Sequence, residues 1–280
     1  MKAGHSIRAL CQALAVSASG YYAWLERRSA PAPRTRQNQQ LLVLIQEEFK
    51  ASRQTYGSPR IYQALRRRGQ VYGRNRIARL MRQHRLSGRP KKRYRVRTTD
   101  SRHNQPIAAN GLAAMSAPQR INQAWVADIT YVATGEGWLY LAGVMDLYSR
   151  KIIGWSMGST LDTSLVLASW HMALHRSPVS GPLLFHSDRG CQYASAEFRH
   201  SLQQYGVVAS MSRKANCYDN AAMESFWSTL KLELIYRRQF ATRAEAQTEI
   251  FAFIEGFYNR TRLHSSLNYL SPVDFETKNN

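Results

Sequence analysis

The stretch that decides the fold is Trp125-Val126-Ala127-Asp128-Ile129-Thr130-Tyr131. Its apolar side chains follow the pattern of a buried strand, and a single carboxylate, Asp128, interrupts them. A carboxylate in such a strand costs free energy unless a partner stabilises its charge. A metal ion is one such partner, and hydrogen bonds from backbone amides are the simpler alternative. Asp128 alone therefore does not establish a site.

A second carboxylate follows another short apolar strand. Residues 183–185 run into His186-Ser187-Asp188-Arg189-Gly190, which places Asp188 at the carboxyl end of that strand. Open α/β sheets bind their ligands at this edge. Asp is also common in tight turns, so a purely structural role for Asp188 has comparable weight.

The third carboxylate, Glu224, lies in an amphipathic helix predicted over residues 220–236. One face of this helix carries Asn220, Glu224, Trp227, Ser228 and Lys231, and the opposite face is apolar. Glu224 is therefore expected to point away from the core, with Lys231 about 10 Å further along the same face. Taken alone, this is an ordinary surface helix that carries a Glu and a Lys.

The order of the predicted elements brings the three carboxylates together. Strands are expected at 123–133, 138–146 and 151–157, with the short loops of an antiparallel meander. A helix (163–176), a strand (183–185), a helix (195–205), a strand (207–211) and two helices (220–236 and 243–258) follow. This order predicts a ribonuclease H-like α/β fold, a mixed five-stranded sheet with flanking helices. The carboxylates then converge on one edge of the sheet.

Other features of the chain narrow the site. We expect turn, cap or surface positions for four other acids, Asp146, Asp162, Asp219 and Glu233. The three cysteines include no Cys-x-x-Cys pair, which argues against a structural zinc ion. No run of about 18 apolar residues is present, so we expect a cytoplasmic protein with no membrane partner.

The front of the chain, residues 1–105, carries nearly all of the net charge of +21. A charge so one-sided favours nucleic acid as the partner, and a basic surface kept for solubility is the alternative. Contacts to backbone phosphate are a safer assignment than base reading. The candidate DNA contacts lie in two Arg-rich helices and the basic stretch after them: Arg60, Arg66, Arg67, Arg74, Arg76, Arg79, Lys91, Lys92 and Arg93.

The sequence predicts four parts. Residues 1–30 resemble a helix-turn-helix segment, although a plain helical hairpin explains them as well. Residues 37–86 form an all-α, Arg-rich helix-turn-helix region, and residues 87–119 form a basic linker. Residues 120–280 form the catalytic core with its C-terminal helices.

At this point the chain resembles the DDE transposases of the retroviral-integrase superfamily, and within them the orfB-type transposases of bacterial insertion sequences (the IS-three family). The resemblance covers nearly the whole chain. It rests on residues 125–131, 186–193, 216–226, 258–267 and 270–272, and in the front half on residues 56–61 and 74–80. The chain lacks the N-terminal His/Cys module of retroviral integrases, which again predicts no zinc.

The resemblance implies a metal-dependent reaction. Asp128, Asp188 and Glu224 would hold two Mg²⁺ ions, for which Mn²⁺ can substitute. With these ions the protein would cleave DNA at the element ends and join the freed 3′-hydroxyl to another strand. Lys231 would contact DNA near the cut. His186, Asn220 and His264 are candidate residues lining the site. A solvated Lys231, a structural hydrogen bond at His186 and a helix-capping His264 are the alternatives.

The resemblance also implies partners. These are the terminal inverted repeats of an insertion sequence, target DNA, a second copy of the chain in a homodimer or larger synaptic assembly, and the product of an upstream reading frame, separate or fused by frameshifting. Such a protein would act at the bacterial nucleoid. Two other functions stay open: a ribonuclease H-like nuclease that only hydrolyses, and a non-catalytic DNA-binding regulator.

Overall fold

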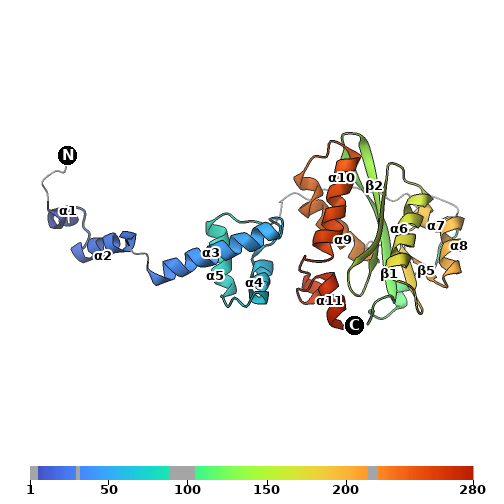
Figure 1. Cartoon of the computed structure of the whole chain (residues 1–280), viewed down its shortest axis with the longest axis horizontal. Helices are drawn as coiled ribbons and strands as arrows, with labels where there is room; N and C mark the ends of the chain where they lie inside the picture. Colours follow the sequence, from blue (N-terminus) through green and yellow to red (C-terminus); the bar gives the residue numbers. More distant parts are fainter. Residues whose placement is uncertain (1–5, 30–31, 89–104, 214–219, 280) are drawn as a thin grey trace. The chain divides into compact units, whose positions relative to one another are not determined.

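The computed structural model describes residues 6–29, 32–88, 105–213 and 220–279. The chain divides into two compact units, Met1–Gly88 and Arg89–Asn280 (Figure 1). The predicted division into four parts stays a prediction, because much of the proposed linker, including Lys91, Lys92 and Arg93, lies outside the described residues. No helix in the part of the chain that the structure describes is both long and apolar enough to cross a bilayer.

The first unit is helical, as its sequence predicts. It contains α1 (Ile7–Ala13), α2 (Ala18–Ser29), α3 (Pro33–Ala51), α4 (Ser58–Arg67) and α5 (Arg74–Gln83). Helix α3 begins at Pro33 rather than at residue 37, since Pro is well suited to the first turn of a helix. The last three helices enclose a small core of fully buried side chains: Leu41, Ile45, Ile61, Leu65 and Ile77.

The second unit is built on a mixed five-stranded sheet in the order β3-β2-β1-β4-β5. Strands β1 (Ala124–Thr134), β2 (Gly137–Asp146) and β3 (Ile152–Gly158) are antiparallel. Strands β4 (Leu184–Ser187) and β5 (Val208–Met211) extend the sheet in parallel to β1. The predicted meander followed by crossovers is confirmed.

Helices cover both faces of this sheet (Figure 1). One face carries α6 (Thr163–Arg176), α7 (Cys191–Ala194) and α8 (Ala196–Gln204), and the other carries α9 (Ala221–Glu233) and α10 (Arg243–Phe251). A π-helix, η4 (Ala252–Tyr258), continues α10, and α11 (Pro272–Asn279) ends the described chain. Single 3-10 turns lie at η1 (Leu112–Ala114), η3 (Ile235–Arg237) and η5 (Ser265–Leu267).

The main core lies between the sheet and helices α6 to α8. Trp170 of α6 is fully buried, with its ring edge-on to Trp125 of β1 and Phe185 of β4. Its indole Nε1 donates to Ser201 Oγ at 3.0 Å, so its polar atom is satisfied. Gly154 of β3 lies against the carbonyl oxygen of Ser169, where a Cβ would not fit, and this lets α6 approach the sheet closely.

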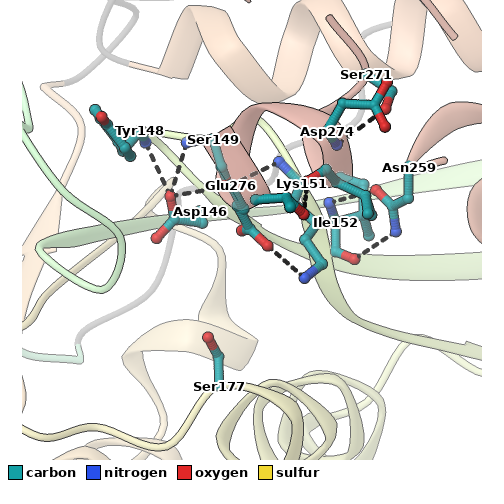
Figure 2. A network of polar contacts seen from close by, with 12 residues as sticks. Asp146, Tyr148, Ser149, Lys151, Ile152, Ser177, Asn259, Ser271, Asp274 and Glu276 are labelled. Atoms are coloured by element: carbon teal, nitrogen blue, oxygen red, sulfur yellow. Dashed lines mark hydrogen bonds and ion pairs between the residues drawn. The ribbon is translucent and has the colours of Figure 1, made fainter. Parts of the chain in front are cut away.

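The corner between β2 and β3 ties the C-terminal elements to the sheet (Figure 2). Asp146 is buried and accepts backbone N–H groups from Asn122, Tyr148 and Ser149 at 2.8, 3.0 and 2.9 Å. The Asn259 amide bonds both the N–H and the carbonyl of Ile152, each at 2.9 Å. Asp146 is therefore a turn residue, as its sequence context predicts.

The predictions for Asp162, Glu233 and Asp219 compare differently with the structure. Asp162 caps α6, as expected, by accepting the Leu165 N–H at 3.2 Å. Glu233 is not a surface residue: it forms a buried, two-bond ion pair with Arg262, both bonds at 2.8 Å. The prediction for Asp219 falls outside the described residues.

Candidate active site

The register of two adjacent parallel strands sets the positions of Asp128 and Asp188. Val126 of β1 pairs with His186 of β4. Asp128 and Asp188 each follow that pair by two residues, and side chains two apart lie on the same face of a strand. Asp128 in β1 and Asp188, the residue directly after β4, therefore lie at the same level of the sheet, and both are half-buried.

Nearby N–H groups donate hydrogen bonds to both oxygens of Asp128 and to Oδ1 of Asp188. Asp128 Oδ1 accepts the Ile129 N–H at 2.8 Å, and Asp128 Oδ2 accepts the indole Nε1–H of Trp227 at 3.0 Å. Asp188 Oδ1 accepts the Gly190 N–H at 3.0 Å. These bonds orient the carboxylates before any ligand arrives.

Burial and mutual repulsion raise the pKa of Asp128 to about 8. Loss of hydration is the larger cause, the charge of Asp188 is the next that raises it, and the charge of Glu224 adds less. The bonds from Ile129 and Trp227 act in the opposite direction. Asp128 thus lies within the electric field of both other acids, a crowding of negative charge that a cation would relieve.

Helix α9 is joined to β1 at two points on either side of Glu224. Asn220 Nδ2 donates to the carbonyl oxygen of Ala127 at 3.0 Å, and Trp227 donates to Asp128, which is the next residue of the strand. Glu224 lies one helical turn from each anchor and is exposed. The helix that carries the third acid is therefore fixed against the strand that carries the first.

A missing side chain makes room for the Trp227 anchor. Gly143 pairs with Asp128 across β1 and β2, and the Trp227 ring lies over it. A Cβ at Gly143 would come within 2.9 Å of the ring. The helical periodicity of the sequence predicts Trp227 on the polar stripe and does not indicate a role for it. A glycine in the middle of a strand that faces a helix is the signal that points to it.

Lys231, one turn beyond Trp227, is half-buried and lies over the ring of Tyr131, with 5.5 Å between Nζ and the ring centroid. Burial lowers the pKa of its ammonium, and the charge of Asp128 opposes that change. Lys231 is therefore a cation near the acids rather than a fully solvated helix charge.

The three candidate lining residues have different surroundings. His186, two positions before Asp188, is fully buried, with Nδ1 2.8 Å from Ser210 Oγ and Nε2 3.0 Å from Ser212 Oγ, so it joins β4 to β5 and to the residue after β5. Asn220 adjoins Asp128 through Ala127, and its Oδ1 is buried with no hydrogen-bond partner in the described residues. His264 lies edge-on to Tyr258.

The donor set fits a hard divalent cation in charge and in chemistry, because carboxylate oxygens are the ligands that Mg²⁺ and Mn²⁺ accept. Within residues 6–29, 32–88, 105–213 and 220–279, no three His, Cys, Asp or Glu side chains stand together as a ready metal-binding group. Asp128 and Asp188 lie on adjoining segments of the sheet, and Glu224 is near enough for its charge to act on Asp128.

The candidate DNA-contacting arginines of the first unit fall into two groups by burial, and Arg66 of the exposed group lies over the ring of Tyr62. Arg66, Arg67, Arg74 and Arg79 are exposed. Arg60 and Arg76 are half-buried and lie over the rings of Tyr56 and Tyr72, and Arg76 Nε also donates to Asn38 Oδ1 at 2.8 Å. Arg76 therefore contributes to the fold of this unit as well as to its charge.

Comparison with known proteins places these observations in a family. The integrase core domain matches residues 118–217 and, in a second form, residues 205–272, and an HTH-like domain matches residues 36–94.

Two curated relatives span nearly the whole chain. The insertion element IS600 uncharacterized 31 kDa protein of Shigella sonnei is 44% identical over 269 residues, 96% of this chain and 98% of that protein. The transposase InsF for insertion sequence IS3A of Escherichia coli (strain K12) is 38% identical over 278 residues, 99% of this chain and 96% of that protein. A solved HTLV-2 integrase catalytic core domain in complex with magnesium is 14% identical and covers 56% of this chain and 98% of its own, with a TM-score of 0.44.

Proposed function

The chain belongs to the IS3 family of insertion-sequence transposases, and we propose that it cleaves and joins DNA at a metal site formed by Asp128, Asp188 and Glu224. Membership in this family makes the chain a transposase with an integrase core. The residues that carry the reaction, the identity of the metal and the DNA steps are the content of the proposal.

The observation that carries the proposal is the placement of two crowded carboxylates at one level of β1 and β4, with the Glu224 helix fastened beside them. Burial, and after it the charge of Asp188, raise the pKa of Asp128 to about 8, so the ionised pair is destabilised unless a cation binds.

Divalent ions, in this proposal two Mg²⁺ with Mn²⁺ as a substitute, would activate the attacking oxygen and stabilise the leaving one. Asp128 and Asp188 would hold the ions, and Glu224 would complete the ligand set from α9. Trp227 and the Gly190 N–H keep the two aspartates oriented. Lys231 binds a phosphate next to the scissile bond and offsets its charge.

The reaction has two displacements at phosphorus. In the first, water attacks a phosphodiester at the element end, a P–O bond to water forms, and the 3′ oxygen leaves as a 3′-hydroxyl. In the second, that 3′-hydroxyl attacks a phosphodiester of target DNA, and the displaced 3′ oxygen takes up the proton. No covalent bond to the protein forms in either step.

The first unit supplies DNA affinity through its exposed arginines, which neutralise phosphates of the terminal inverted repeats. Two element ends must meet for joining, so we infer a homodimer or larger assembly. The product of an upstream frame, separate or fused, is a further expected partner.

The test uses Asp188→Asn in the full chain, with labelled duplexes that carry an element end. We expect wild-type protein with Mg²⁺ to cut the end and join it to a second duplex, and the variant to lose both steps by at least a thousandfold while it still binds the duplex. Asp162→Asn, which changes an exposed helix cap that Asn also provides, is the matched control and keeps full activity.

Two results would contradict the proposal. Joining by Asp188→Asn at the wild-type rate removes Asp188 from the site. Cutting without joining by the wild-type chain, with both ends and target present, favours a nuclease that only hydrolyses.

A further inference from the structure

Tyr193 is a buried residue close to the acids to which the mechanism above gives no role. It lies in α7, the single turn that begins directly after Asp188-Arg189-Gly190, and only 2% of its surface is exposed. Its ring packs edge-on against Phe198, with the centroids 5.5 Å apart, and near Phe185 at 6.4 Å. The ring is therefore held firmly in the main core.

The hydroxyl of Tyr193 has no hydrogen-bond partner among the described residues, although it is fully enclosed. Other buried aromatic residues of this unit have theirs: the indole N–H groups of Trp125, Trp170 and Trp227 donate to Asn122, Ser201 and Asp128. A buried polar group without a partner is costly, and its presence calls for an explanation.

The hydroxyl lies within the field of the two aspartates. Burial is the main cause that raises the pKa of Tyr193 well above its ordinary value, and the charges of Asp128 and then Asp188 raise it further. The phenol therefore stays protonated and keeps a hydrogen to donate, and the charges that act on it come from two carboxylates, which are rich in acceptor sites.

Resting on the metal site proposed above, we propose that Tyr193 is a positioning residue of that site. In the loaded state its hydroxyl donates a hydrogen bond to a ligating oxygen of Asp128 or Asp188 and fixes the orientation of that carboxylate. Groups that bond metal ligands from outside the coordination sphere orient the ligands in this way. The cost of the enclosed hydroxyl in the metal-free chain is then offset on binding.

The test compares Tyr193→Phe with wild-type full-length protein in titrations with Mn²⁺ and Mg²⁺. Metal binding is followed by the rise in melting temperature and by calorimetry, without any DNA. We expect Tyr193→Phe to need about 10- to 100-fold more metal to reach half-saturation. Its metal-free melting temperature stays equal to that of wild type or rises, because the substitution removes a polar group that has no partner.

The matched control is Tyr258→Phe, which removes another buried hydroxyl from the same unit, one that lies near Arg262 and Arg150 rather than near the acids. Its metal half-saturation stays that of wild type. A Tyr193→Phe half-saturation within twofold of wild type overturns the inference, and a lower metal-free melting temperature with unchanged metal binding assigns the hydroxyl a purely structural role.

The same titration separates this inference from the function on which it rests. Binding by wild-type protein that is lost in Asp188→Asn but kept in Tyr193→Phe leaves the proposed metal site standing and removes only Tyr193. No binding by wild-type protein removes both.

Discussion

The indole Nε1 of Trp227 lies 3.0 Å from Asp128 Oδ2 and so joins helix α9 to the central strand of the sheet. Glu224 is carried on that helix, one turn before Trp227. The separation between the first and third acids is therefore set by this hydrogen bond, by the bond from Asn220 to the Ala127 carbonyl, and by the glycine beneath the ring, Gly143.

Removal of that bond gives the first prediction. Trp227→Phe leaves Asp128 Oδ2 without its donor and removes the indole atoms Cζ2 and Cη2 that lie over Gly143, so unfolding in urea should become easier by about 1–3 kcal/mol. Half-saturation with Mn²⁺ should rise about 10-fold or more, since the ligand is no longer oriented.

A matched indole–carboxylate bond provides the control for Trp227. Trp155 Nε1 donates to Glu255 Oε1 at 2.7 Å in the same unit. Trp155→Phe should lose stability as well but should bind Mn²⁺ like wild type. Equal metal binding by both variants and wild type would contradict an orienting role for Trp227.

The raised pKa of Asp128 predicts a specific dependence of stability on pH. The folded value is about 8 and the ordinary value is 3.8, so between these the folded chain binds a proton that the unfolded chain has released. The contribution of Asp128 to stability is therefore favourable below about pH 4 and is lost as the pH rises toward 8. The loss is at most about 1.4 kcal/mol per pH unit.

Urea unfolding of wild type and Asp128→Asn from pH 4 to 8 measures this contribution. Without metal, the stability of wild type should fall relative to that of the variant as the pH rises. Saturating Mg²⁺ should remove most of that fall. Parallel pH curves without metal would show that Asp128 titrates normally.

The position of Lys231 predicts a loss in DNA processing rather than in folding. Lys231→Gln should slow cleavage and reduce the salt dependence of binding by about one phosphate contact, a slope of about 0.9 in log K against log salt. Lys278→Gln, at an exposed lysine of α11, should change neither. An unchanged salt slope and cleavage rate in Lys231→Gln would place the ammonium away from DNA.

The first unit offers a pair of arginines with opposite expectations. Arg79 is exposed on α5, whereas Arg68 is paired with Glu47 and Glu48 at 3.2 and 2.8 Å. Arg79→Gln should weaken binding to element ends severalfold, and the loss should shrink at high salt. Arg68→Gln, whose charge the glutamates already offset, should bind like wild type. Equal effects would show that only total charge matters.

Much of this fold could be predicted from short apolar strands and helix periodicity, because both patterns are local. The meander at 124–158 and the crossover strands follow directly from alternation and turn chemistry. Asp128 and Asp188 could be singled out because each interrupts or ends an apolar strand. Their position at the same level of the sheet could not be predicted, because it depends on the register between β1 and β4, which only the folded sheet sets.

The parts that were missed depend on contacts between distant elements. Helical periodicity predicts Trp227 on a polar stripe, whereas the structure buries its ring against β1 and Gly143 and leaves Glu224 of the same stripe exposed. Tyr193 lies in a helix of one turn, too short to show a period. The burial of Glu233 is not predictable from the local sequence, because its ion-pair partner Arg262 lies 29 positions further along the chain.

The most direct test of the central claim is anomalous diffraction from crystals of the full chain soaked in Mn²⁺. We predict an anomalous peak bonded to carboxylate oxygens of both Asp128 and Asp188, with Glu224 as a further ligand, and no such peak in Asp188→Asn. Saturating Mn²⁺ with no peak between these two aspartates would contradict the account.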